Sequence, residues 1–290
     1  MTLRDVAAAL RPAQWVKNGF VLAALVFSLH LTDRAAVARV ALAFVLFCLA
    51  SSSAYVANDV VDAERDALHE DKRTRPVASG RLGRGRALAL SAALAAASLA
   101  GAAVLGWPMV LCVSGFLALQ AAYSLAIKHV PVLDVVAIAS GFVLRTTAGV
   151  VAAGARMSLW LFAATFLLAL FLALGKRRSE LVRLGAAAPG HRPALALYRR
   201  SAVDPALVVL AVLVAGLYTG YTLSADVAHR LGTANLWLTA PFVVFGVFRY
   251  LSLIHSRDLG GNPTEALLGD KPLLAAVALW AAAVVVLIYA

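Results

Sequence analysis

Long apolar stretches run through almost all of this 290-residue chain, and they constrain its fold more than any other feature. A helix needs about 20 such residues to cross the roughly 30 Å hydrocarbon core of a membrane. We predict nine spans, over residues 15–32, 38–58, 87–105, 108–127, 132–153, 158–175, 203–224, 235–254 and 272–290. With 62% hydrophobic and only 14% charged residues, the composition is that of an all-α integral membrane protein. We expect one transmembrane domain over residues 1–290, with polar loops at 59–86 and 176–202.

The basic residues are distributed unevenly between the two sides of the predicted bundle. The chain has 26 Lys and Arg residues and a net charge of +11, which by itself would suit a nucleic-acid partner. However, the side without the N-terminus receives only Arg34, Arg39, Arg156 and Arg230, and Arg145 lies inside the fifth span. This asymmetry follows the positive-inside rule. We therefore predict a multi-pass protein of the inner cell membrane, surrounded by the lipid bilayer and binding no nucleic acid, with its N-terminus and both loops in the cytoplasm.

One boundary segment, NDVVDAERDALHEDKRTRP at residues 58–76, combines acidic and basic groups. On a helix, four of its oxygen-bearing side chains fall within about 100° of one another. These are Asn58, Asp59, Asp62 and Asp66. Oxygen ligands without cysteine suit a hard ion such as Mg²⁺, which also takes phosphate oxygens, and nearby cations such as Lys72 suit phosphate. We predict a magnesium-bound diphosphate here; the alternative is a solvated helix end with ordinary loop charges.

Two further cations lie within or at the edge of the predicted spans. A central intramembrane arginine is costly, so Arg145 must face the protein interior. It contacts either a lipid-borne phosphate or a structural partner, such as Asp134 or a backbone carbonyl. Lys17 begins the first span, where snorkelling to the interface and a substrate contact are both open interpretations.

Five motifs, in order along the chain, resemble those of one family. NDxxDxxxD after the second span resembles the first aspartate-rich motif of the UbiA prenyltransferase superfamily. The other four are RPAQWVKN (11–18), YSLAIKH (123–129), SGFVLRTTAG (140–149) and GKRRSE (175–180). Together they resemble the decaprenyl-phosphate phosphoribosyltransferases of that superfamily over essentially the whole chain. The resemblance implies a nine-helix UbiA-like bundle and Mg²⁺-dependent transfer of 5-phosphoribose from phosphoribosyl pyrophosphate to a polyprenyl phosphate, releasing pyrophosphate.

The segment after the sixth span separates two branches of this family. UbiA enzymes that transfer a prenyl group generally carry a second acidic motif, DxxxD, there. This chain has GKRRSELVRL instead, which places three cations and one carboxylate on one helical face. Phosphoribosyl pyrophosphate has a second anionic group, its 5-phosphate, and that group needs cations.

Two alternative functions remain open. A prenyltransferase using a prenyl diphosphate and an aromatic or glycerol-phosphate acceptor predicts a second acidic motif. A non-enzymatic lipid-phosphate transporter would use an intramembrane arginine and basic loops, but it gives no reason for four oxygen ligands on one face.

Charge and resemblance together assign roles to individual residues. We predict that Asn58, Asp62 and Asp66 hold Mg²⁺, and that Asp59 acts with the last two as the catalytic acidic set. The predicted substrate-binding residues are Lys17, Asn18, Lys72, Arg75, Tyr123, Lys128, Arg145, Lys176, Arg177 and Glu180. Of these, Tyr123 and Lys128 rest mainly on the resemblance, and Glu180 is either a partner of the neighbouring cations or a further metal ligand. One donor molecule is expected to contact both the acidic face and the basic patch after the sixth span.

Overall fold

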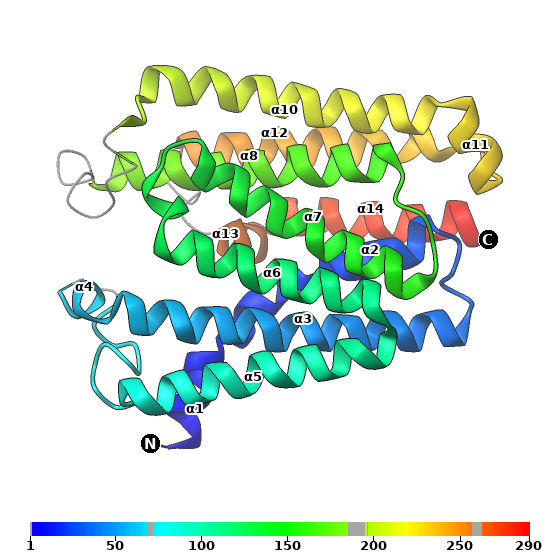
Figure 1. Ribbon diagram of the computed structural model, residues 1–290. Coiled ribbons are helices and arrows are strands. Elements are labelled where there is room, and N and C mark those ends of the chain that lie inside the picture. The colour runs from blue at the N-terminus through cyan, green and yellow to red at the C-terminus, as the bar shows by residue number, and fades with distance from the viewer. Residues whose placement is uncertain (1, 69–71, 185–194, 196, 257–262) are drawn as a thin grey trace. The chain divides into compact units, whose positions relative to one another are not determined.

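A computed structural model of the chain describes residues 2–68, 72–184, 195, 197–256 and 263–290. Every regular element in these ranges is an α-helix or a 3₁₀-helix, which confirms the predicted all-α class (Figure 1). The chain forms two compact units. Unit 1 comprises Met1–Ile127 and Leu144–Arg156, and unit 2 comprises Lys128–Val143 and Met157–Ala290.

Unit 1 is built around one long helix that carries the acidic motif at its end. Its elements are α1 (Leu3–Leu10), η1 (Pro12–Gly19), α2 (Phe20–Phe27), α3 (Arg34–Val61), α4 (Ala63–Ala67), α5 (Arg84–Leu105), α6 (Trp107–Leu125) and the second half of α7 (Leu133–Ala153). Asp33, the residue before α3, caps the helix, because its carboxylate accepts hydrogen bonds from the N–H groups of Ala35 and Ala36. Figure 1 shows α5 and α6 running alongside α3, and both pack against it.

Small polar residues join α3 to α5. Ser53 Oγ donates to the Ser91 carbonyl at 2.8 Å, and Ser91 Oγ donates to the Ser53 carbonyl at 3.0 Å. Both side chains are buried. Small residues let membrane helices approach closely, and their hydroxyl groups bond across the contact. This reciprocal pair fixes the register of α5 against the helix that bears the acidic motif.

The first predicted span, 15–32, has a different form from the one expected. The structure divides it into a 3₁₀-helix, η1, and the short α-helix α2, followed by turns before α3. A 3₁₀-helix rises about 2.0 Å per residue, so η1 and α2 together cover about 28 Å, close to the hydrocarbon thickness of about 30 Å. Eight helices in the described ranges are long and apolar enough to cross a membrane. The predicted count of nine is therefore not confirmed.

The 3₁₀-helix η1 contacts α3 through side chains three residues apart. Side chains three residues apart align on a 3₁₀-helix, which brings Trp15 and Asn18 onto the side that faces α3. There Trp15 Nε1 donates to Ser52 Oγ at 3.0 Å, and Asn18 accepts from Ser51 Oγ at 3.2 Å. Polar contacts with consecutive serines of α3 thus replace the apolar face of an ordinary membrane helix.

Unit 2 contains the first half of α7 and the C-terminal helices. The remaining elements are α8 (Leu159–Leu184), α10 (Arg200–Leu223), α11 (Ala225–Leu231), η5 (Leu236–Thr239), α12 (Ala240–Ser256), α13 (Pro263–Gly269) and α14 (Lys271–Tyr289), and the 3₁₀-helix η2 (Ile127–His129) lies at the junction with unit 1. Arg178, which is fully buried, donates to Asp204 Oδ1 at 2.6 Å and to the Ile254 carbonyl at 2.7 Å. One guanidinium therefore ties α8 to α10 and α12.

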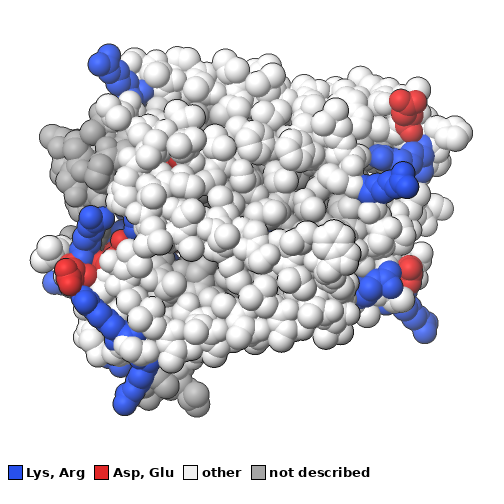
Figure 2. Space-filling model, viewed as in Figure 1, with Lys and Arg blue, Asp and Glu red and all other residues white. Residues whose placement is uncertain are grey.

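The two predicted polar loops are shorter than expected where the structure describes them. The helical conformation continues through α4 to Ala67, and α5 starts at Arg84. Helix α8 runs to Leu184, so GKRRSE is helical, and α10 starts at Arg200. Residues 69–71 and most of 185–196 lie outside the described ranges. In Figure 2 the charged side chains gather at the two ends of the face in view, and the surface between them is almost free of charge, as a multi-pass membrane protein requires.

Helix α7 approaches α2 closely at one glycine. A Cβ atom added to Gly149 would lie 2.0 Å from the carbonyl oxygen of Val21, so a larger residue must push the two backbones apart. This glycine ends the SGFVLRTTAG motif, and its role in that motif is close packing.

We expect Gly149→Ala to lower the free energy of unfolding by about 1–3 kcal/mol through overpacking. Thermal unfolding of the detergent-solubilised protein measures this. Gly216→Ala is the matched control, since Gly216 lies within α10 and an added Cβ meets nothing within 4 Å. The control should be neutral or slightly stabilising, because alanine favours a helix over glycine. Equal effects of the two changes would contradict the close-packing interpretation.

Candidate active site

The acidic motif keeps a helical register across the boundary between α3 and α4. Asp62 N donates to the Asn58 carbonyl at 2.9 Å, and Asp66 N donates to the Asp62 carbonyl at 2.8 Å. These bonds join residues four apart, so Asn58, Asp62 and Asp66 follow one another on one face. Asp59 and Asp66 are buried, whereas the neighbouring Glu64 is 85% exposed. The helix thus separates the motif residues from an ordinary surface carboxylate.

Cations from two other segments converge on the buried carboxylates. Arg75 Nη1 lies 3.1 Å from Asp59 Oδ1 and 2.6 Å from Asp66 Oδ2, so one nitrogen bridges both. Arg11 also pairs with Asp59, and Lys72 Nζ lies 3.7 Å from Asp66. The structure therefore brings Lys72 and Arg75 to the acidic face, as the sequence predicts.

Asp59 retains an acceptor that the described residues do not use. Its side chain is 2% exposed, and its Oδ2 atom is buried and accepts no hydrogen bond from any described residue. A buried carboxylate oxygen of this kind suits a cation. No group of three or more His, Cys, Asp or Glu side chains in the described ranges is arranged to hold a metal ion; Arg11 and Arg75 pair with the carboxylates instead. The all-oxygen donor set still fits Mg²⁺ in kind.

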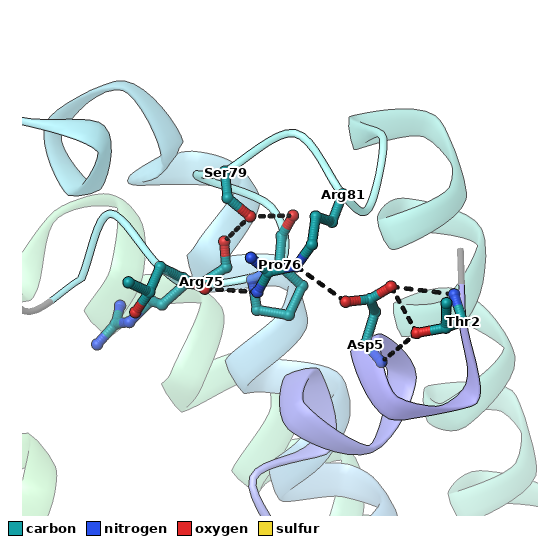
Figure 3. A network of polar contacts seen from close by, with 7 residues as sticks. Thr2, Asp5, Arg75, Pro76, Ser79 and Arg81 are labelled. Carbon is teal, nitrogen blue, oxygen red and sulfur yellow. Dashed lines mark hydrogen bonds and ion pairs between the residues drawn. The ribbon is translucent and has the colours of Figure 1, made fainter.

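A short loop presents Arg75 to the carboxylates, and its own contacts fix it against α1 (Figure 3). Ser79 Oγ donates to the Arg75 carbonyl at 2.7 Å. Arg81 donates to the Thr74 carbonyl at 2.6 Å and to Asp5 Oδ1 at 2.9 Å. Figure 3 shows the Arg75 side chain leaving the loop on the side away from Asp5. Helix α1 therefore supports the loop from one side while Arg75 reaches the acidic motif from the other.

Asp5 also caps the N-terminus of α1, where it forms a capping box with Thr2. The backbone and hydroxyl of Thr2, together with Arg81, lower the pKa of Asp5 to about 2. A carboxyl group whose pKa is lower in the folded protein stabilises the folded state when the pH is above the pKa of the unfolded protein. This stabilisation is lost as the pH falls through the pKa of the folded protein. The contact between α1 and the loop is therefore intact across the whole neutral range.

An apolar cluster lies beneath the same loop. Val77 and Leu82 of the loop are buried with Ala9 of α1 and Val56 of α3, and Ala63 and Ala87 complete the cluster. Burial of these side chains adds a non-directional contribution to the polar contacts of Figure 3. The segment 72–83 is thus a packed element of unit 1, and it orients Arg75.

Arg145 lies in a separate buried polar cluster of unit 1. Its Nε atom donates to Asn18 Oδ1 at 2.7 Å, and its guanidinium lies 4.5 Å from the centre of the Phe116 ring. Asp134, the partner considered from the sequence, lies eleven residues earlier on the same helix, a rise of about 16 Å. Asn18 therefore replaces Asp134 as the partner of Arg145. Lys17, the residue before Asn18 in η1, is half-buried, and Tyr123 lies in the last turn of α6.

In unit 2, the end of α8 carries the predicted basic residues. Lys176 is half-buried, whereas Arg177 is only 1% exposed. Arg177 Nε donates to Asp134 Oδ2 at 2.6 Å, and the same guanidinium pairs with Glu180. Lys128 is buried in η2, which precedes α7. Arg177 thus has two carboxylate partners, and Glu180 is a partner of a neighbouring cation, one of the two roles left open by the sequence.

Three residues of these clusters were not predicted as site residues. Arg11 is the first residue of the RPAQWVKN motif, and its membership of that motif was the available signal. Asp134 was considered only as a partner for Arg145. Tyr198 donates to Asp134 Oδ1 at 2.6 Å, and no local pattern in the sequence marks it.

The helices and the paired charges define a class: an integral membrane protein of the all-α type, with carboxylates and cations concentrated at helix ends. The chain belongs to the UbiA prenyltransferase family, whose family model matches residues 19–264. It is similar to the decaprenyl-phosphate phosphoribosyltransferase of Corynebacterium glutamicum, with 34% identity over 97% of this chain and 86% of the relative. The enzyme of that name from Mycobacterium tuberculosis strain H37Rv is 33% identical over 96% of this chain and 92% of the relative.

Solved structures share the fold. A UbiA homolog from Archaeoglobus fulgidus, solved with GPP and Mg²⁺ bound, matches with a TM-score of 0.74 and 22% identity over 97% of this chain and 99% of that one. A form of that homolog with Cd²⁺ bound matches with a TM-score of 0.71. At this identity the likeness shows the fold, and it confirms the predicted UbiA-like bundle.

We expect Asn18→Ala to destabilise unit 1 measurably. The change leaves Arg145 Nε and Ser51 Oγ without their buried acceptor, which costs about 1–3 kcal/mol. Thermal or denaturant unfolding in detergent measures the loss. Gln14→Ala, on the same 3₁₀-helix, is the control and should change stability by less than about 0.5 kcal/mol. If both variants unfold alike, the Asn18–Arg145 contact contributes nothing to stability.

Proposed function

We propose that this protein is a transferase that moves 5-phosphoribose from phosphoribosyl pyrophosphate to a polyprenyl phosphate, with release of pyrophosphate. The observation that carries the proposal is the basic end of α8, GKRRSE, in a UbiA-family chain whose acidic motif is otherwise intact. Two anionic ends of one donor need one metal-binding and one cationic site. The similarity to decaprenyl-phosphate phosphoribosyltransferases over nearly the full length supports the same function.

The acidic face is the proposed site of the pyrophosphate group. Asn58, Asp62 and Asp66 are the residues that would hold Mg²⁺, with the buried Oδ2 of Asp59 as a further acceptor for a cation or a ribose hydroxyl. Bound there, Mg²⁺ supplies positive charge to the leaving pyrophosphate.

Arg75, Arg11 and Lys72 have a second proposed role beside this face. In the structure they neutralise Asp59 and Asp66. A pyrophosphate oxygen is an equally good partner for a guanidinium fork. Arg75 could exchange Asp66 for a phosphate oxygen without leaving the loop that positions it, and Asp66 would then be available to hold the metal. The cations therefore help to stabilise the negative charge that develops on the leaving group.

The chemistry needs no proton transfer from a side chain. The bond between ribose C1 and the pyrophosphate oxygen breaks with both electrons going to that oxygen, and the sugar passes through an oxocarbenium-like state. The acceptor phosphate, which is largely dianionic near neutral pH with a second pKa of about 6, then forms the new bond to C1 through one of its oxygens. Positioning and charge stabilisation by this chain are therefore sufficient.

The donor's 5-phosphate is assigned to the basic end of α8 and to Lys128. Lys176 is the more accessible cation there, and Arg177 can reach a phosphate by releasing Glu180. Arg145, with Asn18 and Lys17, is assigned to the phosphate of the lipid acceptor, and Tyr123 to a substrate contact. The polyprenyl tail would lie among the apolar helix flanks. The N-terminus, the acidic motif and the basic end of α8 are assigned to the cytoplasmic side of the cell membrane, where the donor is available.

Labelled phosphoribosyl pyrophosphate given to the purified protein with Mg²⁺ and decaprenyl phosphate should yield a labelled lipid and free pyrophosphate. Extraction into organic solvent followed by thin-layer chromatography measures the product. A parallel reaction with geranyl diphosphate and an aromatic acceptor tests the prenyltransferase alternative. Consumption of geranyl diphosphate, with no labelled lipid from the first reaction, would overturn the proposal.

Asp62→Asn should lower kcat at least 100-fold while the thermal midpoint stays within a few degrees of wild type, since the change removes charge needed by the metal and not packing. Glu64→Gln is the matched control, because Glu64 lies two residues away on the exposed side. It should retain nearly full activity. Full activity of Asp62→Asn would remove Asp62 from the metal site.

Lys176→Ala should raise the KM for phosphoribosyl pyrophosphate about tenfold and leave the KM for decaprenyl phosphate unchanged, because one charge-assisted phosphate contact is lost. Initial rates at varied donor and acceptor concentrations separate the two. Arg200→Ala removes an exposed cation at the start of α10, outside the helical face that carries Lys176, and should change neither KM. A selective rise in the acceptor KM of Lys176→Ala would reverse the assignment of the two phosphates.

A further inference from the structure

Tyr198 joins three segments of unit 2 through one hydroxyl group. Its OH donates to Asp134 Oδ1 at 2.6 Å and accepts the backbone N–H of Val132 at 2.9 Å. Asp134, which is fully buried, also accepts Arg177 Nε at 2.6 Å. We call these four residues, together with Glu180 on the other side of Arg177, the Asp134 network. It connects the turn before α7, the basic end of α8 and the segment before α10.

The turn held by Tyr198 is strained. Val132 has φ +66°, a left-handed conformation that costs about 1–3 kcal/mol for a residue of this kind and persists only where its surroundings enforce it. The N–H bond from Val132 to Tyr198 is one such restraint. This turn lies between η2, which carries Lys128, and α7. Its conformation therefore determines where Lys128 stands relative to α7.

The ring of Tyr198 is itself firmly placed. It packs against the apolar cluster of unit 2 that includes Leu174 and Val203. Burial and the hydrogen bond to Asp134 raise the pKa of Tyr198 above its ordinary value. Its OH therefore remains a donor throughout the neutral range, and Asp134 keeps both of its partners.

We propose that Tyr198 is a positioning residue for donor binding, which acts through Asp134 on Arg177 and through Val132 on the turn that follows Lys128. This rests on the proposed function, which assigns these cations to the donor's 5-phosphate. The hydroxyl group satisfies the second oxygen of Asp134. Without it, Asp134 loses a hydrogen bond that helps to orient the carboxylate toward Arg177, and Val132 loses a restraint on its left-handed conformation. Both changes move cations that the 5-phosphate needs.

The test uses Tyr198→Phe in the full-length protein, because this change removes only the oxygen atom and keeps the packed ring. The KM for phosphoribosyl pyrophosphate should rise about tenfold, the effect of weakening one charge-assisted contact between a displaced cation and the 5-phosphate. The kcat and the KM for decaprenyl phosphate should stay within about twofold of wild type. Titration calorimetry with phosphoribosyl pyrophosphate and Mg²⁺, without acceptor, should show the same weakening and remains informative if turnover is lost.

Tyr218→Phe is the matched control. Tyr218 OH is also buried and bonded, to Thr239 Oγ1 at 2.8 Å and to Trp280 Nε1 at 2.7 Å, yet it belongs to no proposed site. A merely structural hydroxyl should lower the thermal midpoint in both variants and leave the donor KM alone. A donor KM of Tyr198→Phe within about twofold of wild type, or equal shifts in both variants, would overturn the inference.

Lys176→Ala, measured in parallel, separates this inference from the function on which it rests. If Lys176→Ala raises the donor KM and Tyr198→Phe does not, the donor site stands and the positioning role of Tyr198 is wrong. If neither variant changes donor binding, the assignment of the donor to this end of α8 fails as well.

Discussion

The pairing of Asp59 and Asp66 with one guanidinium, that of Arg75, is the contact on which the candidate site of unit 1 depends. An isolated charge cannot be buried in apolar surroundings, since each ion loses several kcal/mol of hydration. The motif places two carboxylates on one short stretch of helix, so the fold must bring cations to them, and it does so with Arg75 from a packed loop and Arg11 from the start of η1. The same requirement governs unit 2, where the buried side chains of Asp134 and Arg177 form an ion pair. In both units the buried carboxylates and guanidinium groups thus compensate each other's charge.

These ion pairs explain why a helix end with buried carboxylates can be stable. The ion pairs of Asp59 and Asp66 hold the side chains in place before substrate arrives, and pre-organised charges need little rearrangement during reaction. In the loop that carries Arg75, different contacts hold the backbone and the side chain. Backbone and Asp5 contacts hold the loop, an apolar cluster supports it, and the side chain alone remains available to change partners (Figure 3).

Much of the fold could be predicted from the sequence, because hydrophobic length and the sign of flanking charges are local signals. Helical spacing likewise placed Asn58, Asp62 and Asp66 on one face, and the bonds between their backbones agree with it. Contacts between distant segments could not be predicted. Nothing near residue 198 signals a bond to residue 134, and an arginine in a basic run gives no sign that two carboxylates already surround it. The first span failed for a different reason: hydropathy does not distinguish a 3₁₀-helix from an α-helix, and the polar residues of this segment contact α3.

That 3₁₀-helix has a consequence for how related chains can vary. Its residues repeat every third position, so the indole of Trp15 and the amide of Asn18 meet successive serines of α3 only at one spacing. An inserted or deleted residue between them would rotate everything that follows by about 120° and turn the amide away from Arg145. Exposed positions such as Val16 can change freely in side chain, whereas the length of η1 is fixed by the partners on either side of it.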